Sequence, residues 1–239
     1  MLRAADALGF DKFKDYAIRH FCDKWPDHVQ SVTTQRLKYA ADMVLLARRC
    51  GINYVLKRTL YELVRAEGFR QETDSSAEDD DEINSGRTAL SASDYSLLLH
   101  VREQLTDFWM GRAIPLPQAS VACISPKESD DYKDCAVTTY RIRSMYMKLV
   151  HESKIFEKYR YDPIGGLDAI RDAPWVNGEK WPSKYGRNLL TTNGRLCSAC
   201  GTKWRNIWDR DQKKLWNDLD TWFELINEDD QDNAEELPN

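Results

Sequence analysis

The sequence predicts an all-α protein, and three observations support this fold class. Apolar residues recur at intervals of three and four through most of the chain. No stretch has the regular alternation of apolar and polar residues that marks a half-buried β-strand. Glycine or proline stands at several breaks between the periodic segments, where helices commonly end. At 239 residues and 42% hydrophobic content, the chain can bury a core without disulfide cross-links.

Residues 1–70 contain an internal repeat with a spacing of 42 residues. Apolar residues on both sides of Gly9 align in order with apolar residues on both sides of Gly51. Glycine adopts a positive φ without steric cost and therefore often follows the last residue of a helix. Each copy is predicted to be a pair of helices joined at its glycine. The two hairpins are expected to stack, because each needs a neighbour to cover its apolar face.

One acidic segment follows the repeat, and a second is at the C-terminal end of the sequence. Residues 71–86 carry seven acidic residues and no basic one, and residues 227–239 carry six and none. We expect a disordered linker over 71–89 and a disordered tail over 227–239, because such runs repel themselves and have little to bury. Ser75 and Ser76 each precede an acidic residue by three positions, which suits either an acidophilic kinase or an unmodified loop. The whole chain has net charge −5, but without these thirteen acidic residues it has 34 basic and 26 acidic residues.

A C-terminal helical region is predicted over residues 90–226, packing on the first hairpins. Ser91 and Asp94 have the spacing of a capping box at the start of its first helix. Pro115 and Pro117 end that helix and open a loop to about residue 133. The remaining predicted elements are a long helix that starts near Val137 and ends before Asp162-Pro163, a short helix over 164–171, a loop or hairpin over 172–195, a final helix from about Ser198, and a further turn over 219–225.

Four of the six cysteines predict a metal site in this region. Cys197 and Cys200 are separated by two residues and followed by glycine, which is the spacing of a zinc knuckle. Cys123 and Cys135 are the natural further ligands, because they lie in or beside the predicted 118–135 loop. Four thiolates would close a tetrahedral structural zinc site that ties this loop to the last helix.

The other two cysteines are not expected to bind the metal, and the four predicted ligands have two further interpretations. Cys22 and Cys50 fall on predicted helices of the repeat and are expected to be buried core thiols. The four remaining cysteines are alternatively separate, unligated thiols, since Cys123 and Cys135 lack knuckle spacing. A redox-active dithiol at Cys197 and Cys200 is the third interpretation, although the βαβ setting of thioredoxin-like motifs is missing.

Catalysis and nucleic-acid binding have weaker support in the sequence. The four histidines fall on separate predicted elements and have no catalytic or metal-ligand spacing, so no enzyme activity is predicted: His20, His28, His100 and His151. Residues 136–216 contain sixteen basic and eight acidic residues with Trp and Tyr among them, which is compatible with nucleic-acid binding. The same charges also fit the solvated faces of ordinary helices.

Features that determine cellular location are few. No stretch reaches the ~20 apolar residues of a membrane span, and the first residues lack the apolar core of a secretory signal. Six cysteines without such a signal indicate thiols or a metal in a reducing compartment. We therefore expect no membrane association and a cytoplasmic or nuclear location.

The order of motifs resembles the helical region that follows the BTB/POZ core in a large family of fungal BTB-domain proteins. The resemblance spans about residues 2–225 and includes the four cysteines of the predicted metal site. Its other matching segments, in order, are 2–19, 41–48, 51–52, 56–63, 90–94, 162–167, 215–219 and 223–225.

The resemblance implies a function without catalysis. In that family the BTB/POZ core, which dimerises and contacts cullin-type scaffolds, precedes the region matched here. The matched region looks like a BACK-type interaction module, and the family offers no catalytic residue to place on this chain. We therefore expect an adaptor or scaffold that binds a protein partner. A zinc-knuckle protein that binds nucleic acid through residues 136–216 is the alternative.

Overall fold

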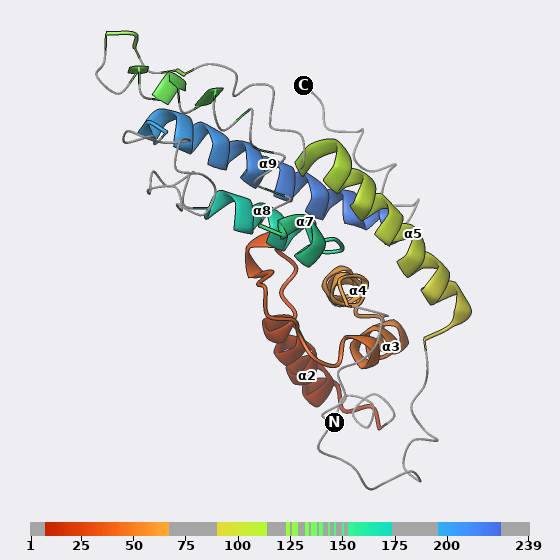
Figure 1. Cartoon of the computed structure of the whole chain (residues 1–239). Helices are drawn as coiled ribbons and strands as arrows, with labels where there is room; N and C mark the ends of the chain where they lie inside the picture. Colours follow the sequence, from red (N-terminus) through yellow and green to blue (C-terminus); the bar gives the residue numbers. More distant parts are fainter. Residues whose placement is uncertain are drawn as a thin grey trace, which may run out of the picture. The chain divides into compact units, whose positions relative to one another are not determined.

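The computed structural model is mainly helical in the residues that it describes (Figure 1). No strand occurs among these residues, so the all-α prediction is confirmed. The predicted linker over 71–89, the predicted tail over 227–239 and most of the predicted 172–195 loop or hairpin lie outside them. The described residues are 8–66, 90–113, 123–124, 126–128, 132–133, 135–137, 139–140, 143, 146, 150, 153–173 and 196–225.

The chain forms two compact units. The first comprises Met1–Gln104 with Trp216–Asn239, and the second comprises Leu105–Leu215. The boundaries of the units therefore fall within helix α5 (Ala92–Phe108) and helix α9 (Ser198–Trp222). The predicted domain boundaries at residues 70 and 90 lie at the two ends of the acidic linker, where the composition of the sequence changes.

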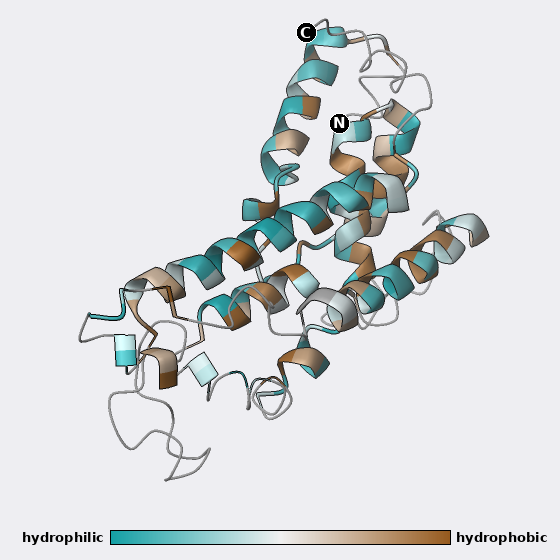
Figure 2. Cartoon of the chain, turned by 90° about the horizontal axis from the view of Figure 1, so that it is seen from above, coloured by the Kyte–Doolittle hydropathy of each residue, from teal (hydrophilic) through white to brown (hydrophobic). Residues whose placement is uncertain are grey.

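Helix α4 (Leu56–Val64) is the most deeply buried element of the first unit, since each of its nine residues is buried. Helix α3 (Ala40–Cys50) packs beside α4, and Val44, Ala47 and Leu60 are fully buried there (Figure 1). Helix α2 (Asp11–Lys24) buries only Ala17 and contacts the 3₁₀ turn Asn53–Val55 that leads into α4. Hydrophilic and hydrophobic residues are both present along the helices (Figure 2).

The two glycines of the repeat form matching turns. Gly9 has a φ of 65° and Gly51 a φ of 67°, and the residues after them, Phe10 and Ile52, have φ, ψ of −87°, 75° and −97°, 70°. Gly51 ends α3 in a Schellman motif, in which the Ile52 N–H donates to the carbonyl of Ala47 at 2.8 Å. The predicted positive φ of both glycines and the predicted helix end at Gly51 are therefore confirmed. The helix expected before Gly9 falls on residues 1–7, which lie outside the described part of the chain, so the stacking of two complete hairpins stays a prediction.

A buried ion-pair network holds the segment between α2 and α3. The side chains of Arg58, Glu62 and Arg65 on α4 are 2%, 0% and 1% exposed. Glu62 accepts from Arg58 at 3.0 Å and from Arg65 at 2.9 Å. Arg58 also donates to the Ser31 hydroxyl at 2.8 Å, and Arg65 to the Thr33 carbonyl at 2.7 Å. Burial lowers the pKa of Arg58, although the Glu62 carboxylate opposes this shift.

Helix α5 begins with the predicted capping box. The Asp94 N–H donates to the Ser91 hydroxyl at 3.1 Å, and the Ser91 N–H donates to the Asp94 carboxylate at 2.9 Å. Asp94 also forms an ion pair with Arg48 at the end of α3. About two turns further along α5, Arg102 donates to the Val64 carbonyl at 2.8 Å, at the C-terminal end of α4.

The last turns of α9 belong to the first unit and pack against α4. The ring of Trp216 meets Tyr61 edge-on, with centroids 5.7 Å apart. The Lys57 ammonium lies 5.2 Å from the Trp216 ring, 2.9 Å from Asp220 and 3.4 Å from Asp27. These contacts cover the face of α4 at which Lys57 and Tyr61 lie.

The second unit contains α7 (Ile155–Lys158), α8 (Pro163–Arg171) and the first part of α9. Asp162 caps α8 by accepting from the Gly165 N–H at 3.1 Å. The predicted short helix over 164–171 is therefore confirmed. Gln212 of α9 donates to the Ile164 carbonyl at 2.8 Å and to the Asp168 carboxylate at 2.7 Å. These two hydrogen bonds connect α9 to α8.

Two predicted helix boundaries in the C-terminal region are wrong. The long helix predicted from Val137 to just before Asp162 is interrupted at Ser153 and Lys154, where Lys154 has a φ of 56°. The apolar residues there, Val150 and Ile155, are five positions apart, which does not fit a continuous helical face. Helix α9 instead continues to Trp222 without the break expected before residue 219. Every helix in the described ranges is too short or too polar to cross a lipid bilayer.

Candidate metal centre

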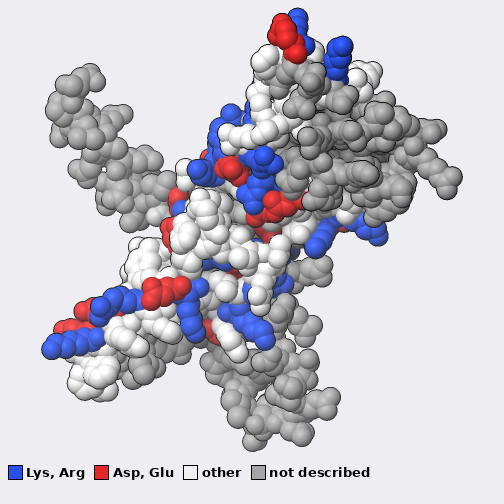
Figure 3. All heavy atoms as spheres, turned by 90° about the vertical axis from the view of Figure 1, so that its left-hand side faces the viewer, with Lys and Arg blue, Asp and Glu red and all other residues white. Residues whose placement is uncertain are grey.

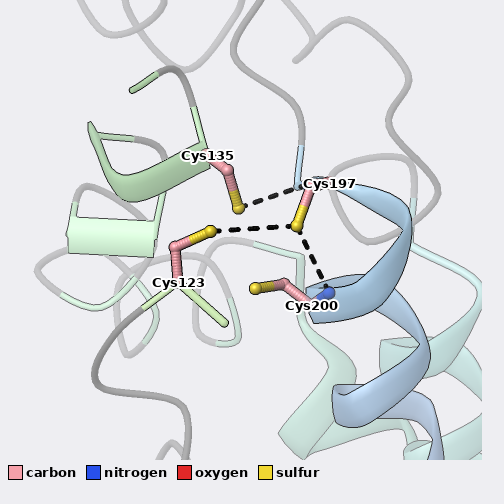
Figure 4. A group of neighbouring side chains, drawn as sticks. All are labelled: Cys123, Cys135, Cys197 and Cys200. Atoms are coloured by element: carbon pink, nitrogen blue, oxygen red, sulfur yellow. Dashed lines mark hydrogen bonds between the residues drawn. The ribbon is translucent and has the colours of Figure 1, made fainter. Parts of the chain in front are cut away.

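The structure brings together the four cysteines that the sequence predicts as metal ligands. The sulfur atoms of Cys123, Cys135, Cys197 and Cys200 all lie within 4.8 Å of one another in the second unit (Figure 4). Cys123 lies in an irregular segment and Cys135 in a helical segment, whereas Cys197 and Cys200 lie at the start of α9. These four side chains could hold a metal ion, and they form the one such group of three or more potential ligands in the described part of the chain.

The start of α9 fixes two of the four sulfur atoms. Cys197 directly precedes the helix, and its sulfur accepts from the Cys200 N–H at 3.4 Å, as an N-cap side chain does. The Cys197 N–H in turn donates to the Cys135 sulfur at 3.2 Å. Backbone N–H groups that point at sulfur, together with the helix dipole, favour the thiolate form that a metal requires.

The separations between the sulfur atoms fit a tetrahedral ion. Bonds of about 2.3 Å from zinc to four thiolates place the sulfurs about 3.8 Å apart. The sulfurs of Cys123 and Cys197 are 3.9 Å apart, and no pair is separated by more than 4.8 Å. The larger separations therefore exceed the tetrahedral value by at most about 1 Å. Small side-chain rotations would close this gap, because rotation about the Cα–Cβ bond of a cysteine moves its sulfur atom.

Burial favours the protonated form of two of these thiols when no cation is near. It raises the pKa of Cys200 to about 11, although a backbone hydrogen bond from Ile124 opposes the shift. It raises the pKa of Cys135 further, and the neighbouring thiols add to this effect. A divalent cation would reverse the balance, because it stabilises thiolates directly. Binding of a metal is therefore expected to release protons.

The four sulfurs differ in their access to solvent. Cys135, Cys197 and Cys200 are 1%, 7% and 3% exposed, whereas Cys123 is half-buried. A site with four protein ligands, three of them buried, offers no open coordination position for a substrate. This arrangement is typical of structural rather than catalytic metal sites.

The two remaining cysteines differ from the prediction. Cys22 and Cys50 are half-buried, so the expectation that both are buried core thiols is wrong. Cys22 lies on α2, which has a single buried residue, and its sulfur is 2.8 Å from the Tyr54 hydroxyl. Cys50 is the last residue of α3, beside the Gly51 corner. Their apolar periodicity predicted helices correctly, but it could not show how completely each helix is covered.

Other chemistry-bearing residues form no comparable group. His20, His28 and His100 are exposed on separate elements, and His151 lies outside the described residues. One cation of the predicted nucleic-acid region is paired with acidic side chains: Arg171 lies 2.8 Å from Asp168 and 3.0 Å from Asp209. On the face shown in Figure 3, basic and acidic side chains are interspersed.

Comparison of the chain with protein-family models, curated proteins and solved structures found no match. The similarity to the helical region of BTB-domain proteins therefore remains a prediction from sequence motifs. The cluster of four cysteines and the exposed apolar residues of the first unit are the observations from which function can be inferred.

Proposed function

We propose that this chain is a non-catalytic, protein-binding helical module whose second unit is stabilised by a structural zinc ion. The observation that carries this proposal is the convergence of four cysteine sulfurs within 4.8 Å. Four thiolates in a tetrahedral arrangement suit zinc, which has no geometric preference of its own and binds sulfur well. Cys123, Cys135, Cys197 and Cys200 would be its ligands.

The proposed zinc links segments that are far apart in the sequence. Cys123 and Cys197 are separated by 74 residues and Cys135 and Cys197 by 62. A shared ion would hold the segments that carry Cys123 and Cys135 at the start of α9. Because such a site does not exist in the unfolded chain, the binding free energy of the metal would stabilise the fold directly.

Exposed apolar residues at the start of α2 support a protein partner. Leu8, Phe10, Phe13 and Tyr16 lie within nine residues and are between 53% and 65% exposed. The rings of Phe10 and Phe13 are 6.2 Å apart. Single exposed apolar residues are common on soluble proteins, but a contiguous group of this kind is typical of an interaction site.

The internal repeat strengthens this interpretation. Ile52 and Val55 occupy the positions that correspond to Phe10 and Phe13 at the spacing of 42, and they are 2% and 0% exposed. The repeat therefore uses these positions as core in its second copy and leaves them uncovered in its first. Arg171, one of the sixteen basic residues of 136–216, is paired with acidic side chains and is to that extent less available to phosphate. An adaptor or scaffold role, as in the BTB-domain family, is consistent with these features.

Chelation tests the zinc part of the proposal. A strong zinc chelator should lower the thermal unfolding midpoint of the wild type. It should have no further effect on Cys200→Ser, which removes one buried ligand. Cys50→Ser is the matched control, because Cys50 lies outside the metal centre, and it should respond to the chelator like the wild type. Equal midpoints with and without chelator in the wild type would contradict a structural zinc.

A paired substitution tests the interaction part. Phe13→Ser with Tyr16→Ser changes two exposed residues of α2 and should alter stability by no more than about 0.5 kcal/mol for each. Proteins captured from a native lysate by the wild type should be lost from the double variant. They should be retained by Leu99→Ser, a change at a residue 53% exposed on α5. Retention of the same proteins by the double variant would contradict binding through α2.

A further inference from the structure

We propose that the metal centre is sensitive to peroxide, which converts Cys123 and Cys197 into a disulfide and so releases the zinc. This inference rests on the proposed zinc site and adds a reversible redox response to it. It depends on two properties of the four-cysteine group: one sulfur is more accessible than the others, and a second sulfur lies close to it.

Cys123 is the ligand that an oxidant in solution would reach first. It is half-buried, whereas Cys135, Cys197 and Cys200 are at most 7% exposed. The next residue in the chain, Ile124, is 50% exposed, so the segment faces solvent at this point. Oxidation of a thiolate depends on its accessibility, and hydrogen bonds to sulfur reduce its reactivity. The hydrogen bonds from the backbone at the start of α9 go to Cys135 and Cys197.

Cys197 is in position to complete the reaction. Its sulfur is 3.9 Å from that of Cys123. A disulfide bond of about 2.05 Å requires the two sulfurs to approach by about 1.9 Å. Cys123 lies outside any helix and Cys197 directly precedes α9, whereas Cys135 and Cys200 are in helical residues, so the approach involves the two sulfurs that no helix holds.

The reaction proceeds in two balanced steps. The Cys123 thiolate attacks hydrogen peroxide; an S–O bond forms, the O–O bond breaks, and hydroxide leaves. The Cys197 thiolate then attacks the sulfur of the resulting sulfenic acid; an S–S bond forms, the S–O bond breaks, and a second hydroxide leaves. Peroxide gains two electrons, the two thiolates lose two, and two protons convert the hydroxides to water. The zinc keeps two of its four thiolate ligands, which do not hold it tightly. A thiol reductant restores the site.

The experiment uses the full chain loaded with zinc. Its zinc content is measured first; one equivalent of hydrogen peroxide is then added, and released zinc is followed with a chromophoric chelator. We expect release of about one zinc per chain. The product is then digested with trypsin under non-reducing conditions. Cys123 falls in peptide 113–127, Cys135 in peptide 134–141, and both Cys197 and Cys200 in peptide 196–203. We expect peptide 113–127 linked to peptide 196–203, with fragmentation assigning the bond to Cys197.

Two variants identify the first sulfur to react. Cys123→Ser should slow the release of zinc at least tenfold, whereas Cys22→Ser, which changes a half-buried cysteine outside the centre, should leave the rate unchanged. If Cys123→Ser does not retain zinc, the peptide map of the wild type decides. A bond between Cys197 and Cys200, or zinc that stays bound, would overturn this inference alone. A wild-type chain that contains no zinc before peroxide is added would contradict the proposed function and this inference with it.

Discussion

Gly166→Ala is expected to destabilise the second unit, because a methyl group at this position would enter the ring of Trp109. The added Cβ would lie 2.1 Å from Cζ2 and 2.4 Å from Cη2 of Trp109. Carbon atoms in contact are about 3.5–4.0 Å apart, so the ring would have to move by about 1.4 Å. Trp109 is fully buried, and its indole N–H donates to the Tyr159 carbonyl at 2.7 Å. Its room to move is therefore small.

The size of this effect follows from two costs and one gain. Overpacking of a buried site costs about 1–3 kcal/mol. Displacement of the ring would break the bond from Trp109 to Tyr159 and leave buried polar groups unpaired, at a cost of about 1–3 kcal/mol. Replacing glycine by alanine in a helix returns at most about 1 kcal/mol. The free energy of unfolding should therefore fall by about 1–5 kcal/mol.

Urea unfolding of the zinc-loaded protein, followed by tryptophan fluorescence, measures this change. Gly111→Ala is the matched control, since no atom lies within 4 Å of a Cβ at that position. It should leave the stability unchanged or raise it by up to about 1 kcal/mol. A Gly166→Ala protein within about 0.5 kcal/mol of the wild type, which is the spread of ordinary surface changes, would refute the packing described for Trp109.

Two further predictions concern charged groups of the first unit. Glu62→Gln should lower the free energy of unfolding by about 3–5 kcal/mol, because it leaves Arg58 and Arg65 buried without their counter-charge. Glu103→Gln, on the exposed face of α5, is the control and should change it by less than about 0.5 kcal/mol. Similar urea midpoints for the two variants would argue against the network. Burial alone would raise the pKa of Asp94, but hydrogen bonds from Ser91 and Arg48 lower it overall. The ionised Asp94 therefore contributes stability above its unfolded pKa of about 3.9, and this contribution is lost as the pH falls through the lower folded value. The difference in stability between wild type and Asp94→Asn should accordingly be larger at pH 7 than below about pH 3, and a difference independent of pH would contradict the assignment.

Local features of the fold could be predicted from local sequence patterns. The capping box at Ser91 and the glycine corners at Gly9 and Gly51 depend on a few neighbouring residues, and the structure contains all three. The buried network of α4 could not be predicted in this way. Arg58 and Glu62 are four positions apart, which is also the spacing of ion pairs on solvated helix faces. Only the packing of distant segments around α4 distinguishes the two cases.

The candidate metal centre was partly predictable for a similar reason. The spacing of Cys197 and Cys200 indicated a knuckle, and exclusion of Cys22 and Cys50 left Cys123 and Cys135 as the other ligands. The accessibility of each sulfur depends on tertiary packing, as does the hydrogen bond from the Cys197 N–H to Cys135. The same holds for Gly166, whose sequence neighbours indicate a helix start but not the ring of Trp109 against it.

The metal content of the native protein tests the central claim most directly. Protein purified without chelator and analysed by inductively coupled plasma mass spectrometry should contain about one zinc per chain. The four sulfurs within 4.8 Å of one another should then resist alkylation until the protein is denatured or the metal is removed. A chain that is folded, contains no zinc or other transition metal, and has all four of these thiols open to alkylation in the native state would contradict the claim.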